Sequence, residues 1–359
     1  MLSELGTLSV IISILITSLI IYYSFTEVNI QNNILSKKFI YLSTSQFIFT
    51  ILSFLILLVA YIYSDFSLVN VYENSHTNKS LLYKISGVWG NHEGSLLLWI
   101  TILVFFSFLF LYFNKSIKKN FLLLTLAFQN MLILGFLIFL LTNSNPFSEI
   151  FPVPSEGMGL NPILQDPALA IHPPLLYLGF VGSSIYFSAA LGSLISNFNG
   201  INFAKTIKNW VLLSWFFQTI GILVGSIWAY YELGWGGYWF WDPVENSSLM
   251  PWFLMTALIH SILILERKNG IYTWVIILSI LTFTMSVTGT FLVRSGILNS
   301  VHTFANDPSR GLYILIFLSL MVLSSLYIFY KYTPKEKNDF KFFTKEFFIL
   351  INNWFMIFF

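Results

Sequence analysis

The chain has 359 residues, of which 56% are hydrophobic and 9% are charged, and its mean hydropathy is +0.76. Soluble domains carry about 25% charged residues, so this composition excludes a soluble protein and predicts an all-α polytopic membrane protein. The net charge of +2 says little about partners, and nucleic acid is not expected among them. The absence of cysteine excludes disulfides, thiolate metal sites and any thiol supplied by this chain.

Apolar runs mark the membrane spans, because a helix needs roughly 20 residues to cross about 30 Å of hydrocarbon. The first run is too long for a signal-peptide core and lacks a small-residue cleavage site after it, so it is kept as a span. The predicted spans are residues 6–24, 39–63, 95–113, 121–142, 175–196, 209–229, 250–265, 271–291 and 312–330. Pro251 is taken as the first-turn proline of the seventh span. A truncated tenth span begins near residue 347.

Lysine and arginine are distributed unequally between alternate loops. Of the 18 basic residues, only Lys79, Lys84, Arg294 and Arg310 fall on one side, and the other 14 fall on the opposite side. The positive-inside rule makes the side with 14 basic residues cytoplasmic. The N-terminus is then outside, together with the loops near residues 64–94, 143–174, 230–249 and 292–311.

Two of these outer loops lead into spans through polar residues. Residues 86–95 combine glycine, tryptophan, histidine and glutamate, with Glu93 placed near the positive end of the next helix dipole. The simplest structural interpretation of this stretch is a helix cap. In the next loop Pro173 and Pro174 follow His172, which predicts an extended backbone at His172 and a fixed direction for its ring.

The most unusual stretch is Trp228 to Trp252, which lies between two apolar runs. Its five tryptophans are Trp228, Trp235, Trp239, Trp241 and Trp252. The glycines between them allow tight turns, so that several indoles can approach one flat object. The stretch also carries three acids and no lysine or arginine. The alternative interpretation is an aromatic belt at the membrane interface.

The five histidines, at positions 76, 92, 172, 260 and 302, suggest what the flat object is. His172 and His302 flank the tryptophan stretch in sequence and fall on the same predicted side. Two neutral imidazoles on either side of an aromatic platform are what six-coordinate haem iron requires. Arg294 and Arg310 are the candidate cations for the haem propionates, because a guanidinium matches a carboxylate in a bidentate manner. Each histidine taken alone is compatible with an ordinary polar loop residue.

His260 differs from the others because it lies inside the predicted seventh span. An ionisable group at that depth is costly, so a functional role is the default hypothesis. Three roles stay open: a haem ligand, a proton relay, or a histidine satisfied by a serine or threonine of a neighbouring helix.

Residues 235–243, Trp-Gly-Gly-Tyr-Trp-Phe-Trp-Asp-Pro, resemble the tryptophan-rich WWD signature of the haem-handling proteins of cytochrome c maturation. That family includes CcmF, NrfE, CcmC and the CcsA-type synthases. The runs 88–99 and 289–311 resemble the CcmF-type haem lyase in particular. The resemblance implies that His172 and His302 are the two outer haem ligands, and that His260 is one of two transmembrane ligands of a resident haem b. Proteins of this type are usually longer, and their further spans and second transmembrane histidine are not reached here.

The resemblance also implies a mechanism and a setting. The chain would be a single haem-handling domain over residues 1–359, in the bacterial inner membrane, with its tryptophan loop at about 230–249 facing the periplasm. The mitochondrial inner membrane is the alternative. The chain would receive haem from the chaperone CcmE and hold it against Trp235, Trp239 and Trp241, with Asp242 orienting either the platform or a donor group. It would then present the haem to apocytochrome c, delivered by subunits of the CcmH/CcmI type, for thioether attachment. The resident haem would reduce the iron, with quinol as the electron source.

Two other classes of function stay open. A multi-span transporter or proton-translocating subunit predicts several buried charges within the spans, whereas the charges here are almost confined to loops. A purely structural assembly scaffold predicts that the purified protein shows no haem absorption.

Overall fold

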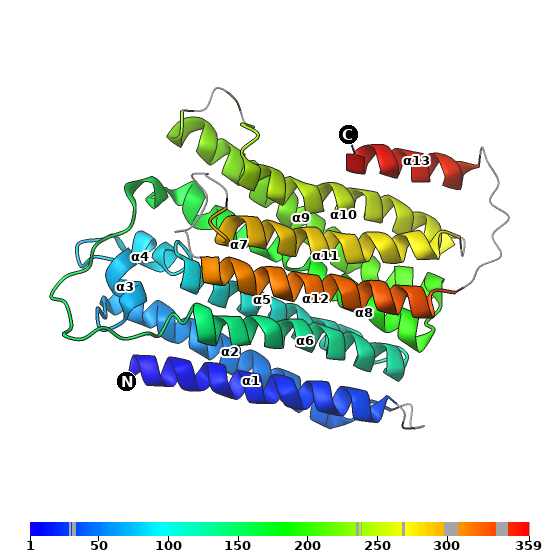
Figure 1. Cartoon of the computed structure of the whole chain (residues 1–359), viewed down its shortest axis with the longest axis horizontal. Coiled ribbons are helices and arrows are strands. Elements are labelled where there is room, and N and C mark those ends of the chain that lie inside the picture. The colour runs from blue at the N-terminus through cyan, green and yellow to red at the C-terminus, as the bar shows by residue number, and fades with distance from the viewer. Residues whose placement is uncertain are drawn as a thin grey trace.

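The computed structural model describes residues 1–28, 30, 34–234, 237, 239–267, 270–297, 308–334 and 344–358. Long helices lie side by side and form an elongated bundle (Figure 1). The described residues contain no β-strand, only one isolated antiparallel bridge between Leu68 and Glu149. The predicted all-α class is therefore confirmed.

Within the described residues, nine helical stretches are long and apolar enough to cross a membrane. They are α1 (Leu2–Glu27), α2 (Lys37–Tyr63), α5 (His92–Phe113), α6 (Lys119–Asn143), α7 with α8 (Pro167–Phe180 and Ser183–Ser196), α9 (Gly200–Glu232), α10 (Pro243–Arg267), α11 (Tyr272–Arg294) and α12 (Pro308–Tyr332). This confirms the nine predicted spans. The last helix, α13 (Lys345–Phe358), has 14 residues and is shorter than the roughly 20 that a span requires.

Several helices begin earlier than their apolar runs, because a helix begins at a cap rather than where hydropathy rises. α9 begins at Gly200, where the Asn199 side chain accepts hydrogen bonds from the N–H groups of residues 201 and 202. α10 begins at Pro243, so the prediction that Pro251 opens this span was wrong. Pro251 lies inside α10. In the turn before it, Gln218 of α9 donates a hydrogen bond of 2.8 Å to the carbonyl of Ser248.

The backbone at His172 is helical, so the predicted extended conformation was also wrong. α7 begins after Asp166, whose carboxylate caps the N–H groups of residues 168 and 169, and it continues through both prolines. Pro174 has no N–H for the carbonyl of Ala170 four residues earlier. The indole N–H of Trp89 donates to that carbonyl at 3.0 Å instead. A hydrogen bond from another segment therefore satisfies the carbonyl that Pro174 leaves without a helical partner.

The fifth span consists of two helices, because the α-helical pattern stops at Val181 and Gly182 between α7 and α8. Ser184 and Ile185 bond to carbonyls three residues earlier, at Val181 and Gly182. A Cβ on Gly182 would lie 2.6 Å from the Ser214 hydroxyl and 2.7 Å from the ring of Phe106. Close packing against α5 and α9 therefore accompanies the break.

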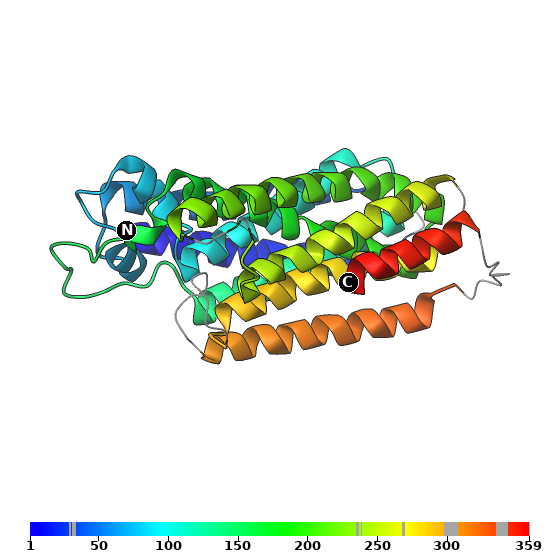
Figure 2. The same cartoon turned by 90° about the horizontal axis from the view of Figure 1, so that it is seen from above.

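Buried polar side chains join the helices inside the bundle. Gln46 of α2 donates to Thr17 of α1 at 2.7 Å and to Asn130 of α6 at 2.8 Å. Such bonds hold helices together where lipid supplies no hydrophobic force between them. α12 lies at the edge of the bundle (Figure 2), and only 22% of its most apolar 18-residue stretch is buried inside the structure.

The short helices lie at one end of the bundle. The N-terminus lies at the end that carries the short helices α3 (Val69–Asn74) and α4 (Leu81–Gly87) and the 3₁₀ turn η1 (Pro162–Leu164) (Figure 1). The C-terminus of α9 and the first residues of α10 lie at this end as well. We call it the outer end. Its membrane side stays a prediction from the positive charges.

Candidate functional site

A cavity of about 300 Å³ opens at the outer end between α7, α9, α10 and α11. Its volume is at the lower limit of small-molecule sites, which span about 300–1,000 Å³. Aromatic side chains form much of its wall: Trp89, Trp99, Trp228, Trp239, Tyr177 and Phe180. His172 and Arg294 also line it. The cavity therefore combines flat apolar walls with an imidazole and a guanidinium.

His172 is held against α9 by a polar contact and by a steric one. Its Nδ1 lies 2.6 Å from the carbonyl oxygen of Gly221. A Cβ on Gly225 would lie only 2.3 Å from His172 Cε1, so only glycine leaves room for the ring there. A third contact ties the same two helices, because the hydroxyl of Tyr231 donates to Asp166, the cap of α7, at 2.7 Å.

Asp242 caps α10. Its Oδ2 accepts a hydrogen bond from the N–H of Val244 at 2.9 Å, and the carboxylate of Glu245 reaches back to the N–H of Asp242 at 3.2 Å. This reciprocal pair is a capping box. That Asp242 orients the tryptophan platform stays a prediction. By capping α10, its carboxylate would fix the start of the helix that follows the tryptophan loop.

Glu245 also fixes the conformation of the tryptophan loop. The same carboxylate oxygen accepts from the N–H groups of Phe240 and Asp242, which flank Trp241. Trp241 has φ +62°, a left-handed conformation that costs a bulky residue about 1–2 kcal/mol. The two hydrogen bonds stabilise that conformation. As a result, Trp239 lines the cavity while Trp241 is 70% exposed.

The structure separates the tryptophans that the sequence groups together. Trp228 is buried at the cavity wall, and Trp239 lines the same cavity. Trp252 does not line the cavity, and its ring stacks on Trp215 of α9 with centroids 6.1 Å apart. Trp235 lies outside the described residues. The described part of the stretch thus contributes two indoles to the cavity rather than one continuous platform.

Arg294, at the C-terminus of α11, is 2% exposed and lines the cavity. One guanidinium nitrogen donates to the carbonyl of His92 at 2.8 Å, and the other donates to the hydroxyl of Ser95 at 2.8 Å. Both of these acceptors are neutral. Arg294 places a guanidinium at the cavity wall, and its binding to a propionate stays a prediction.

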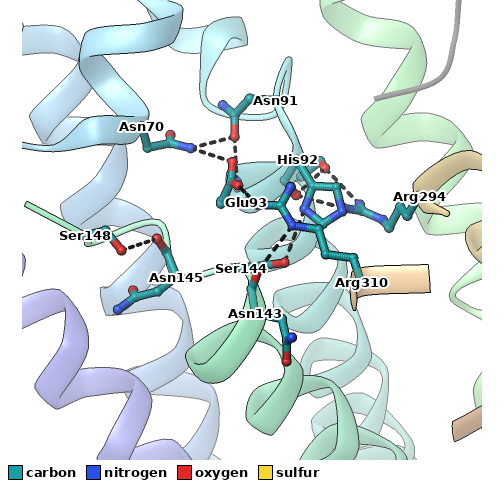
Figure 3. Close-up of polar contacts among 12 residues, drawn as sticks. Asn70, Asn91, His92, Glu93, Asn143, Ser144, Asn145, Ser148, Arg294 and Arg310 are labelled. Atoms are coloured by element: carbon teal, nitrogen blue, oxygen red, sulfur yellow. Dashed lines mark hydrogen bonds and ion pairs between the residues drawn. The ribbon is translucent and has the colours of Figure 1, made fainter. Parts of the chain in front are cut away.

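Arg310 lies in a polar cluster at the outer end, which Arg294 also joins through its hydrogen bond to the His92 carbonyl (Figure 3). Its guanidinium contacts the carboxylate of Glu93 at 2.7 Å and donates to the carbonyl of Asn143 at 3.2 Å. Asn70 and Asn91 complete the surroundings of Glu93, since Asn70 donates to Asn91 at 2.8 Å and to Glu93 at 3.2 Å. Arg310 does not line the cavity. Arg310, the second cation predicted to bind a haem propionate, is therefore paired in the structure with a carboxylate of the chain itself.

Residues 86–95 form the cap that their sequence suggests. Asn91 is the N-cap of α5 and accepts a hydrogen bond from the N–H of Gly94 at 2.8 Å. Glu93 stands in the first turn, where the helix dipole stabilises a negative charge. A Cβ on Gly94 would lie 1.7 Å from the carbonyl oxygen of Val88, so this turn requires glycine.

The remaining histidines are spread over the molecule. His92 contacts Ser144 at 3.3 Å in the polar cluster, and His76 lies 3.8 Å from Glu156 on the outer surface. His260 is exposed on α10, with Nδ1 2.8 Å from the carbonyl of Thr256. His302 lies outside the described residues, so its predicted pairing with His172 stays a prediction.

Several site residues were not identified from the sequence. Trp89, Trp99 and Tyr177 line the cavity from segments far from the tryptophan loop. Glu245 was recognisable, because Asp242-Pro-Val-Glu245 has the spacing of a capping box. The four-residue spacing of Gly221 and Gly225 was a signal for close helix packing.

The described part of the chain contains no group of three or more histidine, cysteine, aspartate or glutamate side chains able to hold a bare metal ion. Haem iron requires only one or two side chains, because the porphyrin supplies four nitrogens. The donor set at the cavity, one histidine with aromatic walls, is compatible with a haem.

Comparison with known proteins supports the same kind of site. Residues 89–298 match the family model described as cytochrome C assembly protein. The chain is 53% identical over 285 residues to the cytochrome c-type biogenesis protein CycK of Bradyrhizobium diazoefficiens, covering 79% of this chain and 43% of that protein. It is 47% identical over 278 residues to CcmF of Escherichia coli, covering 77% of this chain and 43% of that protein.

A solved structure, the cytochrome c haem lyase CcmF, has the same fold. The TM-score is 0.82 at 26% sequence identity, and the match covers 99% of this chain and 54% of that one. The chain spans about half the length of the relatives it matches. On the family model, which matches more than half of the chain, and on these relatives, the chain belongs to the cytochrome c assembly protein family and is of the CcmF type.

Proposed function

We propose that this chain is the haem-holding part of a cytochrome c haem lyase. The observation that carries this proposal is the outer-end cavity, where His172, the indoles of Trp228 and Trp239, and Arg294 meet. Family membership supports a role in cytochrome c maturation. The substrate, the haem and the reaction are proposals, because the chain spans only about half of its relatives.

Each residue type matches one part of a haem. Imidazole is an axial ligand for the iron. Indole faces stack on the porphyrin plane and exclude water from it. A buried guanidinium pairs with a propionate more strongly than an exposed one, because little solvent screens the charge. In this proposal His302 supplies the second axial ligand from the segment that follows α11.

The chain's contribution to the reaction is positioning. Thioether formation adds each cysteine S–H of the client across a haem vinyl group, so that a C–S and a C–H bond form and no atom is lost. This chain has no cysteine, so both thiols come from the apocytochrome. Trp235, Trp239 and Trp241 would hold the haem so that its vinyl edge meets those thiols, and the Asp242 cap would fix the loop.

His260 is proposed as a ligand of a resident haem b. Its imidazole is exposed on α10, which is one of the candidate membrane spans. The ring is therefore accessible to a group bound beside this helix. A haem there would supply electron transfer to the substrate iron. The second ligand would come from another polypeptide segment.

The proposed setting follows from the relatives. The membrane helices and the bacterial CcmF relatives support a protein of the bacterial inner membrane. The outer end would face the periplasm. The proposed partners are a haem chaperone of the CcmE type, the apocytochrome, and apocytochrome-handling subunits of the CcmH/CcmI type.

Visible absorption of the purified chain tests the proposal. We expect the chain to bind haem with a low-spin spectrum, and His172→Ala to lose that spectrum. His76→Ala is the matched control, because it makes the same change in an outer-end histidine that contacts Glu156 rather than the cavity. A His172→Ala variant that keeps both the native spectrum and the native affinity would contradict the proposal.

Activity is tested in cells that lack their own lyase. The chain, produced together with a C-terminal companion from a relative, should restore covalent cytochrome c, measured by haem staining after denaturing electrophoresis. Trp239→Ala should reduce the yield, whereas Trp252→Phe should retain it, because Trp252 packs away from the cavity. Equal yields from both variants would argue against the cavity as the haem seat.

A further inference from the structure

The ring of His172 lies in a seat made by two glycines of α9. Gly221 and Gly225 are one helical turn apart, on the same face of the helix. Gly221 contributes its carbonyl oxygen, 2.6 Å from Nδ1. Gly225 leaves room for the ring because it has no side chain. An added Cβ would lie 2.3 Å from Cε1, 2.6 Å from Nδ1 and 2.9 Å from Nε2.

The contact with Gly221 determines where the proton of the ring resides. A carbonyl oxygen has no proton to give, so the 2.6 Å contact requires that Nδ1 carries the hydrogen and donates it. In a neutral imidazole the lone pair is then on Nε2. The seat therefore selects one of the two tautomers.

From this geometry we infer that Gly221 and Gly225 are positioning residues for haem binding, which make His172 bind iron through Nε2. The inference rests on the proposed haem-holding function of the cavity. Metal-binding histidines commonly donate their second N–H to a carbonyl or carboxylate, which fixes the ring and increases its basicity as a ligand. Here the acceptor is a backbone carbonyl in the middle of a helix, so no side-chain substitution can remove it.

The prolines of α7 support the same arrangement from the other side. Trp89 donates its indole N–H to the carbonyl of Ala170, which Pro174 leaves without a helical partner. This contact fixes the backbone around His172, while the glycines of α9 fix the ring. Trp89 also lines the cavity, so it lies beside the group that His172 would hold.

Chemical rescue of a cavity variant tests which nitrogen carries the proton. The purified His172→Gly chain is given haemin and then imidazole, 4-methylimidazole or 1-methylimidazole. All three molecules have a nitrogen lone pair for iron, but 1-methylimidazole has no N–H to donate to Gly221. We expect imidazole and 4-methylimidazole to restore the low-spin spectrum at concentrations about ten-fold lower than 1-methylimidazole, after correction for their binding to haemin in detergent.

The outcomes separate this inference from the function on which it rests. If His172→Gly does not alter the haem spectrum, His172 is not a ligand and both fail. If the spectrum changes and all three molecules restore it at equal corrected concentrations, the haem proposal stands and the role of Gly221 is overturned.

A second variant tests the steric part of the seat. Gly225→Ala should abolish the native low-spin spectrum, because the added methyl must displace the ring. Gly270→Ala is the matched control, since a Cβ at Gly270 meets no atom within 4 Å. If Gly225→Ala prevents folding, the same change is made in the His172→Gly chain, where the ring is absent and folding should return. A Gly225→Ala chain with native spectrum and affinity, or a double variant that still does not fold, would overturn the role of Gly225.

Discussion

Two regions at the outer end contain the same kinds of residue and use them in opposite ways. The cavity brings together His172, Arg294 and Glu245, and the polar cluster brings together His92, Arg310 and Glu93, with Arg294 joining the two through the His92 carbonyl. In the cluster the charged groups contact one another, with Arg310 on Glu93 at 2.7 Å. At the cavity wall, Arg294 donates to the His92 carbonyl and the Ser95 hydroxyl, and Glu245 accepts from backbone N–H groups of the tryptophan loop.

The difference teaches that residue type does not identify a site. The cluster is a structural contact between helices, because the half-buried charges of Arg310 and Glu93 compensate each other. The cavity keeps an imidazole, indole faces and a buried positive charge around an empty volume of about 300 Å³. The following predictions test this distinction, beginning with the largest expected effect.

The largest effect is expected where the cluster joins α5. Gly94→Ala would place a methyl 1.7 Å from the Val88 carbonyl, so the cap must open, at a cost of about 3 kcal/mol or more in unfolding free energy. Thermal unfolding of the detergent-solubilised chain measures this. Gly270→Ala, which meets no atom, should unfold like the native chain. A native-like Gly94→Ala chain would show that the turn is not rigid.

The two arginines should separate stability from haem affinity. Arg310→Met leaves the Glu93 carboxylate without its counter-ion and should cost about 1–3 kcal/mol, with haem affinity unchanged in the folded fraction. Arg294→Met should reduce haem affinity about ten-fold, since it removes the cation at the cavity wall.

Haem titration followed by visible absorption, together with thermal unfolding, compares these two variants. The double variant Glu93→Gln with Arg310→Met should recover part of the stability lost by Arg310→Met alone. Reduced haem affinity in a stable Arg310→Met chain would instead assign Arg310 to the haem site.

A smaller loss of stability is expected from substitution of Asp242. Asp242→Ala should reduce stability by about 1 kcal/mol, whereas Asp242→Asn should be nearly neutral, because asparagine is an equally good N-cap. Thermal unfolding and covalent cytochrome yield should therefore both be retained in the asparagine variant. Equal loss of yield in both variants, with stability kept, would indicate that the carboxylate acts chemically.

The smallest effect is expected on the outer surface at Glu156. The Thr77 hydroxyl and N–H donate to this carboxylate and hold its pKa at about 2, below the ordinary value near 4.5. A lowered pKa means that the contact stabilises the fold above about pH 4.5 and that this contribution is lost as the pH falls toward about 2. Stability should not change with this group between pH 7 and 5.

Thr77→Val removes the hydroxyl donor, so the pKa of Glu156 should rise toward its ordinary value. The carboxyl resonance of protein labelled at glutamate, identified by its loss in Glu156→Gln, measures the pKa directly. An unchanged pKa in Thr77→Val would mean that the backbone donors alone set it.

Most of the fold could be predicted because membrane spans follow from local composition. All nine spans were found from apolar runs. The beginnings of α7 and α10 were missed, because hydropathy does not detect caps such as Asp166 and Asp242. The helix through Pro173 and Pro174 could not be predicted, since its compensating donor, Trp89, lies 81 residues away from Ala170.

The site could be predicted only in part, for a related reason. His172, Arg294 and Trp239 were selected by residue type and do meet at the cavity. Arg310 was selected by the same criterion, but its place beside Glu93 depends on a contact between α12 and α5 that no local pattern contains. The seat of His172 likewise depends on which face of α9 meets α7.

The break between α7 and α8 divides one membrane span into two parts with different surroundings. Twelve of the 14 residues of α8 are buried, whereas three of the 14 residues of α7 are. Between the two helices the backbone keeps right-handed helical angles, and the hydrogen bonds of Ser184 and Ile185 run to carbonyls three residues earlier instead of four. The sparsely buried half, α7, is also the half that lines the cavity, whereas α8 packs in the core of the bundle, so one span combines an exposed binding wall with a buried support.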